Sequence, residues 1–98
     1  RVFIQFAGYK RGWVVDLAGK LAEAGWRVEG GDRGGERIAA AAGLNEVRYF
    51  NPADAERAMA LAEAVATAAP GTAATVVDLS GGKYAQPQPG LLEVWISE

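Results

Sequence analysis

The chain holds few side chains that do chemistry near neutral pH, because it has neither histidine nor cysteine among its 98 residues. Disulfides, thiolate catalysis and zinc sites built from imidazole or thiolate ligands are therefore excluded. The remaining acid–base candidates are two carboxylate pairs, Asp54 with Glu56 and Asp32 with Glu36. Asp54 and Glu56 fall in the first turn of an expected helix, where the helix dipole explains them. No carboxylate spacing of the EF-hand type occurs, so we expect neither a metal nor a cofactor.

One further pair has the residue types of a known catalytic chemistry. Acylphosphatases, which are ferredoxin-like enzymes, use one arginine and one asparagine, and Arg11 and Asn45 match them in type. The segment AGYKRGW does not supply the phosphate-cradling sequence that such an enzyme needs between its first strand and first helix. We therefore expect the chain not to be an enzyme.

The glycine-rich segment GGDRGG, from Gly30 to Gly35, is the one loop whose backbone suits a phosphate. Arg33 and Arg37 would supply the charge of such an anion site. The segment lacks the P-loop spacing with its Lys-Ser/Thr pair, and it also lacks the GxGxxG spacing. A flexible hairpin tip is therefore favoured over an anion-binding loop.

The elements that position these residues form two strand–helix–strand halves in tandem. In the first half, Val2 to Phe6 predicts a strand, and Gly12 to Ala24 predicts an amphipathic helix that ends before Gly25. The segment from Trp26 to Glu29 predicts the returning strand. The apolar face of the helix consists of Val14, Leu17, Ala18 and Leu21.

The second half repeats this plan. Asn45 to Phe50 predicts a strand, and Asn51-Pro52 predicts the start of a helix that Pro70-Gly71 ends. Thr75 to Leu79 predicts the returning strand, and Leu91 to Ser97 a fifth strand. The narrow apolar stripe of this helix consists of Ala55, Ala58, Leu61, Ala62 and Val65. Between the halves, ERIAAAAG predicts one or two helical turns, with an irregular hairpin as the alternative.

The order of elements predicts an α+β fold of the ferredoxin-like two-layer sandwich type. It reads βαββαβ plus an extra C-terminal strand, with an antiparallel sheet and both helices on one face. We expect residues 1–98 to form a single domain. Because the chain opens on Arg1 rather than methionine, we expect this domain to come from a longer protein.

The segment VFIQFAGY, followed by an amphipathic helix and later by NEVRYFNPADAERAMALAEAV, resembles bacterial SPOR domains. Phe3, Ile4, Gln5 and Gly8 match the first SPOR strand, and Val47 and Arg48 match the strand before the second SPOR helix. The chain is also similar to the C-terminal domain of LytR-type cell-envelope proteins. The block GERIAAAAGLNEVRYF resembles an accessory domain at the C-termini of bacterial caspase-like and other multidomain proteins. The SPOR resemblance implies binding of peptidoglycan strands on the sheet face.

Strand alternation predicts which residues lie on the sheet face opposite the helices. With the purely apolar residues turned to the helices, this open face carries Phe3, Gln5, Arg48, Phe50 and Trp95. Aromatic rings beside an arginine and an amide suit a protein partner, a sugar ring or a nucleobase. Two alternatives are that the GGDRGG–AAAA segment packs on this face, or that a second copy of the domain does.

We therefore predict a non-catalytic binding module of a larger bacterial protein. It would engage a protein partner or its parent chain through the open sheet face and exposed edge strands, such as Leu91 to Ser97. The alternatives are peptidoglycan binding in the SPOR manner and an ACT-like regulatory domain for a small ligand, and a homodimer also stays open.

Composition bounds the partners and the compartment. The net charge of −2, with both signs interspersed, gives no footprint for nucleic acid. No apolar run approaches the roughly 20 residues that span a bilayer, so membrane insertion is not expected. The compartment would follow the parent protein, in the bacterial cytoplasm or the cell envelope.

Overall fold

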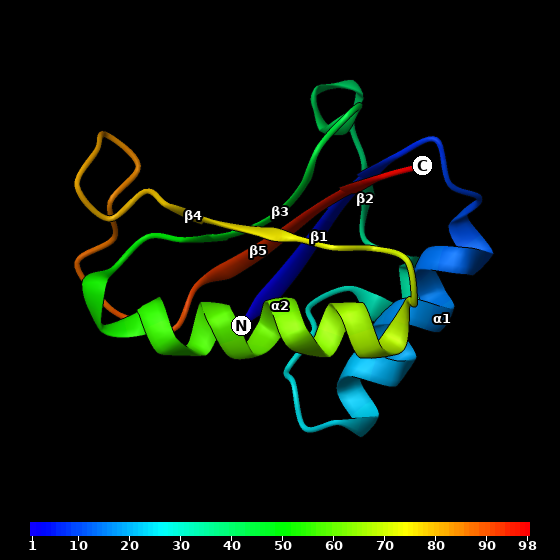
Figure 1. The fold of residues 1–98 in the computed structure, drawn as a ribbon, viewed down its shortest axis with the longest axis horizontal. Helices are drawn as coiled ribbons and strands as arrows, with labels where there is room; N and C mark the ends of the chain where they lie inside the picture. Colours follow the sequence, from blue (N-terminus) through cyan, green and yellow to red (C-terminus); the bar gives the residue numbers. More distant parts are fainter.

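Alternating apolar residues in the strands and two amphipathic helices fold this chain into two layers (Figure 1). The computed structural model describes all residues, 1–98. Its strands are β1 (Val2–Ala7), β2 (Glu36–Arg37), β3 (Asn45–Tyr49), β4 (Thr75–Asp78) and β5 (Leu92–Ser97). Its helices are α1 (Arg11–Glu23) and α2 (Ala55–Ala68), with 3₁₀ turns η1 (Gly31–Arg33), η2 (Ala39–Ala41) and η3 (Pro52–Asp54).

The sheet is mixed, with the strand order β2-β1-β5-β3-β4. The pairs β1–β2, β1–β5 and β3–β4 are parallel, and only β3–β5 is antiparallel. The α+β class is therefore confirmed, but the expected antiparallel, ferredoxin-like sheet is not found. The reason is that each helix returns the chain to the strand beside the one it left. The two halves consequently lie side by side instead of interleaving.

Strand β5 fills the space between the two halves. Its central residue Val94 pairs with Ile4 of β1 on one side and with Val47 of β3 on the other. The prediction that Leu91 to Ser97 offers an exposed edge is therefore wrong. An apolar strand of this length hydrogen-bonds on both sides in the middle of the sheet, which leaves β2 and β4 as the two edges.

A single core lies between the sheet and the helices, which cover the same face (Figure 1). The predicted face of α1 is confirmed, since its buried residues are Val14, Leu17, Ala18 and Leu21. In α2 only Ala58, Leu61 and Val65 are buried, and Ala55 and Ala62 are half-buried. The strands contribute Val2, Ile4, Phe6, Val47, Leu92, Val94 and Ile96, each at most 1 % exposed. No helix has both the length and the apolar character that crossing a membrane requires.

The connection from α1 to β3 departs most from expectation. Instead of a strand over Trp26–Glu29, a single bridge joins Val28 to Val2 before the chain leaves the sheet. The segment Gly30–Gly35 is not a hairpin tip, because it forms the η1 turn and its carbonyls at Arg33 and Gly35 accept hydrogen bonds from Arg11. The expected helical turn in ERIAAAAG is the 3₁₀ turn η2, and β2 precedes it.

Candidate functional site

Four of the five residues predicted for the open face lie on the three central strands, β1, β5 and β3, and Phe50 follows the end of β3. Strand register places these four in two rows across the sheet. One row is Phe3, Glu93, Arg48 and Val77, and the other is Glu36, Gln5, Trp95, Glu46 and Thr75. The alternation has the predicted parity, because the intervening strand residues Ile4, Val47 and Val94 belong to the core.

The chain itself covers one end of this face. The η2 turn contacts β1 and β5, and Figure 1 shows its segment on the side of the sheet away from the helices. Ala41 of this turn is fully buried, and Ser97 Oγ donates a hydrogen bond of 3.1 Å to the carbonyl of Leu44. Gln5 is only 9 % exposed. Cover by the alanine segment, one of the two alternatives, therefore applies to this end, where little of Gln5 is exposed.

The other end of the face is closed by the connection between β4 and β5. The N–H of Gln86 donates to the carbonyl of Phe50 at 2.8 Å, and Asn51 Nδ2 donates to the carbonyl of Gln86 at 3.0 Å. Phe50 is 6 % exposed. Its ring is therefore also unavailable to a partner, although its parity places it on the predicted face.

Between the covered ends lies an open strip of five half-buried residues: Phe3, Glu46, Arg48, Glu93 and Trp95. The guanidinium carbon of Arg48 lies 4.0 Å from the centroid of the Trp95 ring, a cation–π contact. Arg48 Nε donates to Glu46 Oε1 at 2.9 Å, and Trp95 Nε1 donates to Glu93 Oε1 at 2.9 Å. The strip is therefore held in one arrangement before any partner arrives.

This arrangement leaves several hydrogen-bonding groups of the strip unused within the chain. Glu46 and Glu93 each use only Oε1, and the two terminal nitrogens of Arg48 have no hydrogen-bond partner in the chain. The strip thus offers acceptors and donors around two aromatic rings. One face of the Trp95 ring is occupied by Arg48, which limits what can stack there.

A cavity of about 460 Å³ adjoins the strip on the side of β2. It forms where the chain leaves β1 after Glu29 and returns at Glu36. Its charged lining consists of Arg11, Glu29, Arg33 and Glu36, with Phe3 and Gln5 on the sheet side. Two cations and two carboxylates balance, so the cavity does not have the charge of an anion site.

The two arginines proposed for an anion loop are not brought together. Arg33 lines the cavity, whereas Arg37 donates to the carbonyl of Tyr9 at 3.2 Å and lies 4.7 Å from the Phe6 centroid. The backbone N–H groups of Arg33 and Gly34 donate to carbonyls within the loop, so they do not form a phosphate cradle.

The pair that matched acylphosphatases in residue type makes structural hydrogen bonds. Arg11 donates to two carbonyls of the glycine-rich segment. Asn45 Oδ1 accepts from the N–H of Ser97 at 3.4 Å. These side chains hold the glycine-rich segment to α1 and β5 to β3.

Comparison of the chain with models of protein families, with curated proteins and with solved structures finds no match in any of the three. The resemblance to SPOR and LytR-type domains therefore stays a prediction. The open strip has to be interpreted from its own chemistry.

Sequence reasoning missed the two carboxylates of the open strip. Glu46 and Glu93 share the parity of Arg48 and Trp95, and each lies two residues from its partner on the same strand. Side chains at i and i+2 of a strand point to the same face, so this spacing was the signal that could have found them.

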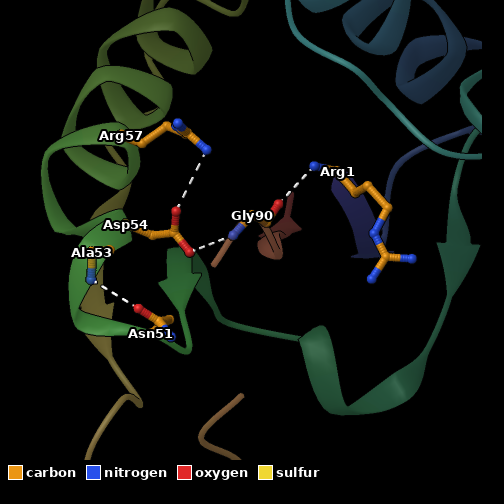
Figure 2. Close-up of polar contacts among 6 residues, drawn as sticks. All are labelled: Arg1, Asn51, Ala53, Asp54, Arg57 and Gly90. Carbon is orange, nitrogen blue, oxygen red and sulfur yellow. Dashed lines mark hydrogen bonds and ion pairs between the residues drawn. The ribbon is translucent and has the colours of Figure 1, made fainter. Parts of the chain in front are cut away.

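It also missed the role of Asp54, which does more than face the helix dipole. The side chain is almost fully buried, and its Oδ2 accepts a hydrogen bond of 2.7 Å from the N–H of Gly90 (Figure 2). Oδ1 lies 3.5 Å from Arg57 Nη1. The helical segment begins at Asn51-Pro52 as predicted, and Asn51 Oδ1 caps it by accepting from the N–H of Ala53 (Figure 2). Asp54 thus ties the segment before β5 to the start of α2.

A polar cluster fixes the end of the β4 edge. Asp78 Oδ1 accepts hydrogen bonds from the hydroxyl and the N–H of Ser80, which hold the pKa of Asp78 below its usual value of 3.8. Partial burial and a hydrogen bond to Asp78 raise the pKa of the Tyr49 phenol. Both effects favour an ionised Asp78 beside a neutral Tyr49 at neutral pH.

Proposed function

We propose that this chain is a non-catalytic binding module of a larger bacterial protein and that its open strip engages a protein partner. The observation that carries the proposal is the Arg48–Trp95 stack, half-buried on a sheet face that no helix covers. Tryptophan and arginine are enriched among the residues that dominate binding energy in protein interfaces. The partner is either a separate protein or another part of the parent chain.

The free groups of the strip favour a polypeptide over a glycan. A polypeptide supplies both N–H donors for Glu46 and Glu93 and carbonyl or carboxylate acceptors for Arg48. A sugar ring binds by stacking on an exposed aromatic face, and Arg48 already occupies one face of Trp95. Gln5 and Phe50, which the glycan alternative would also use, are buried.

The test begins with site-specific photo-crosslinking in the producing cells. A photoreactive amino acid replaces Glu93 in the open strip, and the matched control places it at Glu63, an exposed carboxylate on α2. We expect an adduct with one protein, or with another part of the parent chain, from position 93 and not from position 63.

The partner is then purified and its affinity measured with defined variants. Trp95→Ala and Arg48→Gln should each weaken binding at least tenfold, or about 1.4 kcal/mol, whereas Thr67→Ala on α2 should leave it unchanged. Circular dichroism checks that each variant is folded. Equal adducts from positions 93 and 63, or unchanged affinity in both strip variants, would contradict the proposal. Co-sedimentation with purified peptidoglycan that depends on Trp95 would replace it with the glycan function.

A further inference from the structure

The edge strand β4 has backbone groups that no neighbour uses. The N–H of Leu79 donates to the carbonyl of Tyr49 at 2.9 Å, and Tyr49 pairs with Asp78 in parallel register. In a parallel pair one register partner bonds to the two residues that flank the other partner. Here Tyr49 bonds toward β4, so Val77 and Leu79 point toward β3, and Asp78 points its N–H and C=O away from β3. The N–H and C=O groups of Val76 and Asp78 therefore point outward from the sheet.

Several of the usual protections are missing from this edge, whose one charged side chain is Asp78 at the end of the strand. Natural edge strands are shielded by proline, lysine or other charges, by being very short, by a bulge or by a covering segment. The β4 sequence Thr-Val-Val-Asp contains no proline or lysine, and it pairs with β3 in an unbroken register. Figure 1 views the molecule from this side, with β4 crossing in front of β5 and β1. The edge is thus able to accept another strand.

An apolar stripe of α2 faces the same side as this edge. At 100° per residue, Ala55, Met59, Ala62 and Ala66 fall within an arc of about 60°. The opposite flank of α2 faces α1, since Lys20 of α1 donates to the carbonyl of Ala68. The stripe therefore faces away from α1, toward the free edge of β4. Met59 in its middle is 54 % exposed and is one of the two large apolar side chains most exposed in the chain.

We propose that the occupant of this surface is a second copy of the chain, joined by a two-fold axis perpendicular to the sheet. Such an axis pairs β4 with its copy in antiparallel fashion and keeps all helices on one face of a continuous sheet. The second copy is favoured because it brings its own unprotected edge and its own small-residue stripe in matching positions.

The spacing of the two layers supports this partner. Helix α2 contacts β3 and β4, so its axis lies over that pair of strands. With adjacent strands about 4.8 Å apart, the two α2 axes in the dimer lie two strand spacings apart, or roughly 9.6 Å. Packed helices lie about 8–10 Å apart, and small side chains suit that approach. One two-fold operation therefore satisfies the strand edge and the helix stripe together.

The outward-pointing groups also select the register. Pairing Val76 with Asp78 of the copy uses both outward-pointing residues of each β4 and forms four backbone hydrogen bonds. The axis then passes beside Val77, which faces Val77 of the copy as a non-hydrogen-bonded pair with Cα atoms about 4.5 Å apart. Val77 is half-buried and lies on the open-face side, where this contact buries it further.

Disulfide trapping tests the register directly, because the chain has no cysteine of its own. Val77→Cys should give a covalent dimer with diamide as the oxidant, since disulfides need Cα atoms within about 7 Å. The control is Thr75→Cys, on the same strand and the same face. Its two copies would lie about 14 Å apart in this register and should stay monomeric.

Oligomeric state without a covalent link is the second readout. Analytical ultracentrifugation of the unmodified chain should show a dimer of twice 10.3 kDa. Met59→Glu should weaken the dimer at least tenfold, whereas Ala60→Glu, the same charge change on the solvent side of α2, should not.

A monomer at every accessible concentration, or a dimer that neither traps at position 77 nor responds to Met59→Glu, would overturn the proposal. Photo-crosslinking from position 93 would be unaffected by that result, so the failure of this proposal is distinguishable from failure of the proposed function.

Discussion

The two strand–helix–strand halves follow the same plan and differ at the strand that returns from the helix. In the second half, β4 pairs with β3 over four consecutive residues. In the first half, Val28 makes one bridge to β1, the chain leaves as a glycine-rich turn, and only two residues return as β2. The glycine-rich segment directly after Glu29 explains the difference, because it turns the chain away from β1, whereas no such segment interrupts Thr75–Asp78.

This difference gives the sheet two unlike edges, a two-residue strand on one side and a four-residue strand on the other. On the β2 side, a short charged strand, Glu36–Arg37, follows an excursion of the chain, and both features discourage strand addition. On the β4 side no such excursion precedes the strand, which has four residues and only one charged side chain, Asp78. The two edges of this sheet are thus unequal, and the dimer proposed above uses the longer one, β4.

The largest loss of unfolding free energy should come from replacing Gly35, which lies in the first half and has no counterpart in the second. A Cβ added at Gly35 would lie 2.5 Å from the carbonyl oxygen of Ile4, on backbone with φ of +68°. Because the backbone at Gly35 and at Ile4 would have to shift to relieve this contact, Gly35→Ala should lower the free energy of unfolding by at least about 3 kcal/mol.

The matched control is Gly43→Ala, where φ is +78° and no atom lies within 4 Å of the added Cβ. It carries only the left-handed backbone cost of about 1–2 kcal/mol. Urea unfolding measures both variants. Equal losses would mean that the close approach of the turn to β1 adds no strain beyond the left-handed backbone cost.

A smaller loss of unfolding free energy should come from removing the Asp54–Gly90 hydrogen bond, which ties the segment before β5 to the second half. Asp54→Ala leaves the N–H of Gly90 without its acceptor and should cost about 2 kcal/mol. Asp54→Asn keeps an oxygen in place and should cost clearly less. Arg57→Ala should cost at most about 1 kcal/mol, since the Arg57 side chain is 60 % exposed. A larger loss for Arg57→Ala than for Asp54→Ala would show that the ion pair is the main contact.

Local patterns predicted the elements better than their arrangement. The four apolar residues of α1 and the parity of the strands follow from periodicity alone, and both are found in the structure. The strand order does not follow from it, because the position of β5 depends on which two edges are free after both halves have folded. Of the five apolar residues predicted to form the buried face of α2, Ala58, Leu61 and Val65 are buried, whereas Ala55 and Ala62 are half-buried at the side of the core.

The candidate site shows the same limit. Parity placed Phe3, Arg48 and Trp95 on the face without helices. It could not show that η2 crosses one end of that face and that the segment around Gln86 closes the other, because these contacts join residues far apart in sequence. Gln5 and Phe50 are buried for that reason.

The smallest predicted effect is on the pKa of Asp78 at the end of β4 and on the stability that depends on it. The β2 edge has no matching polar cluster. The hydroxyl and N–H of Ser80 lower the pKa of Asp78 in the folded chain, so the resulting stability is present above the unfolded value and is lost as pH falls through the folded value. Ser80→Ala should raise the Asp78 midpoint toward 3.8, as measured by carboxyl NMR titration. The difference in unfolding free energy between wild type and Ser80→Ala should accordingly shrink as the pH falls below 3.8.

Tyr49→Phe should move the Asp78 midpoint less, because the Tyr49 hydrogen bond is a smaller cause of the shift than either bond from Ser80. If Tyr49→Phe moves it more, the edge is held mainly by the phenol and not by the turn at Ser80.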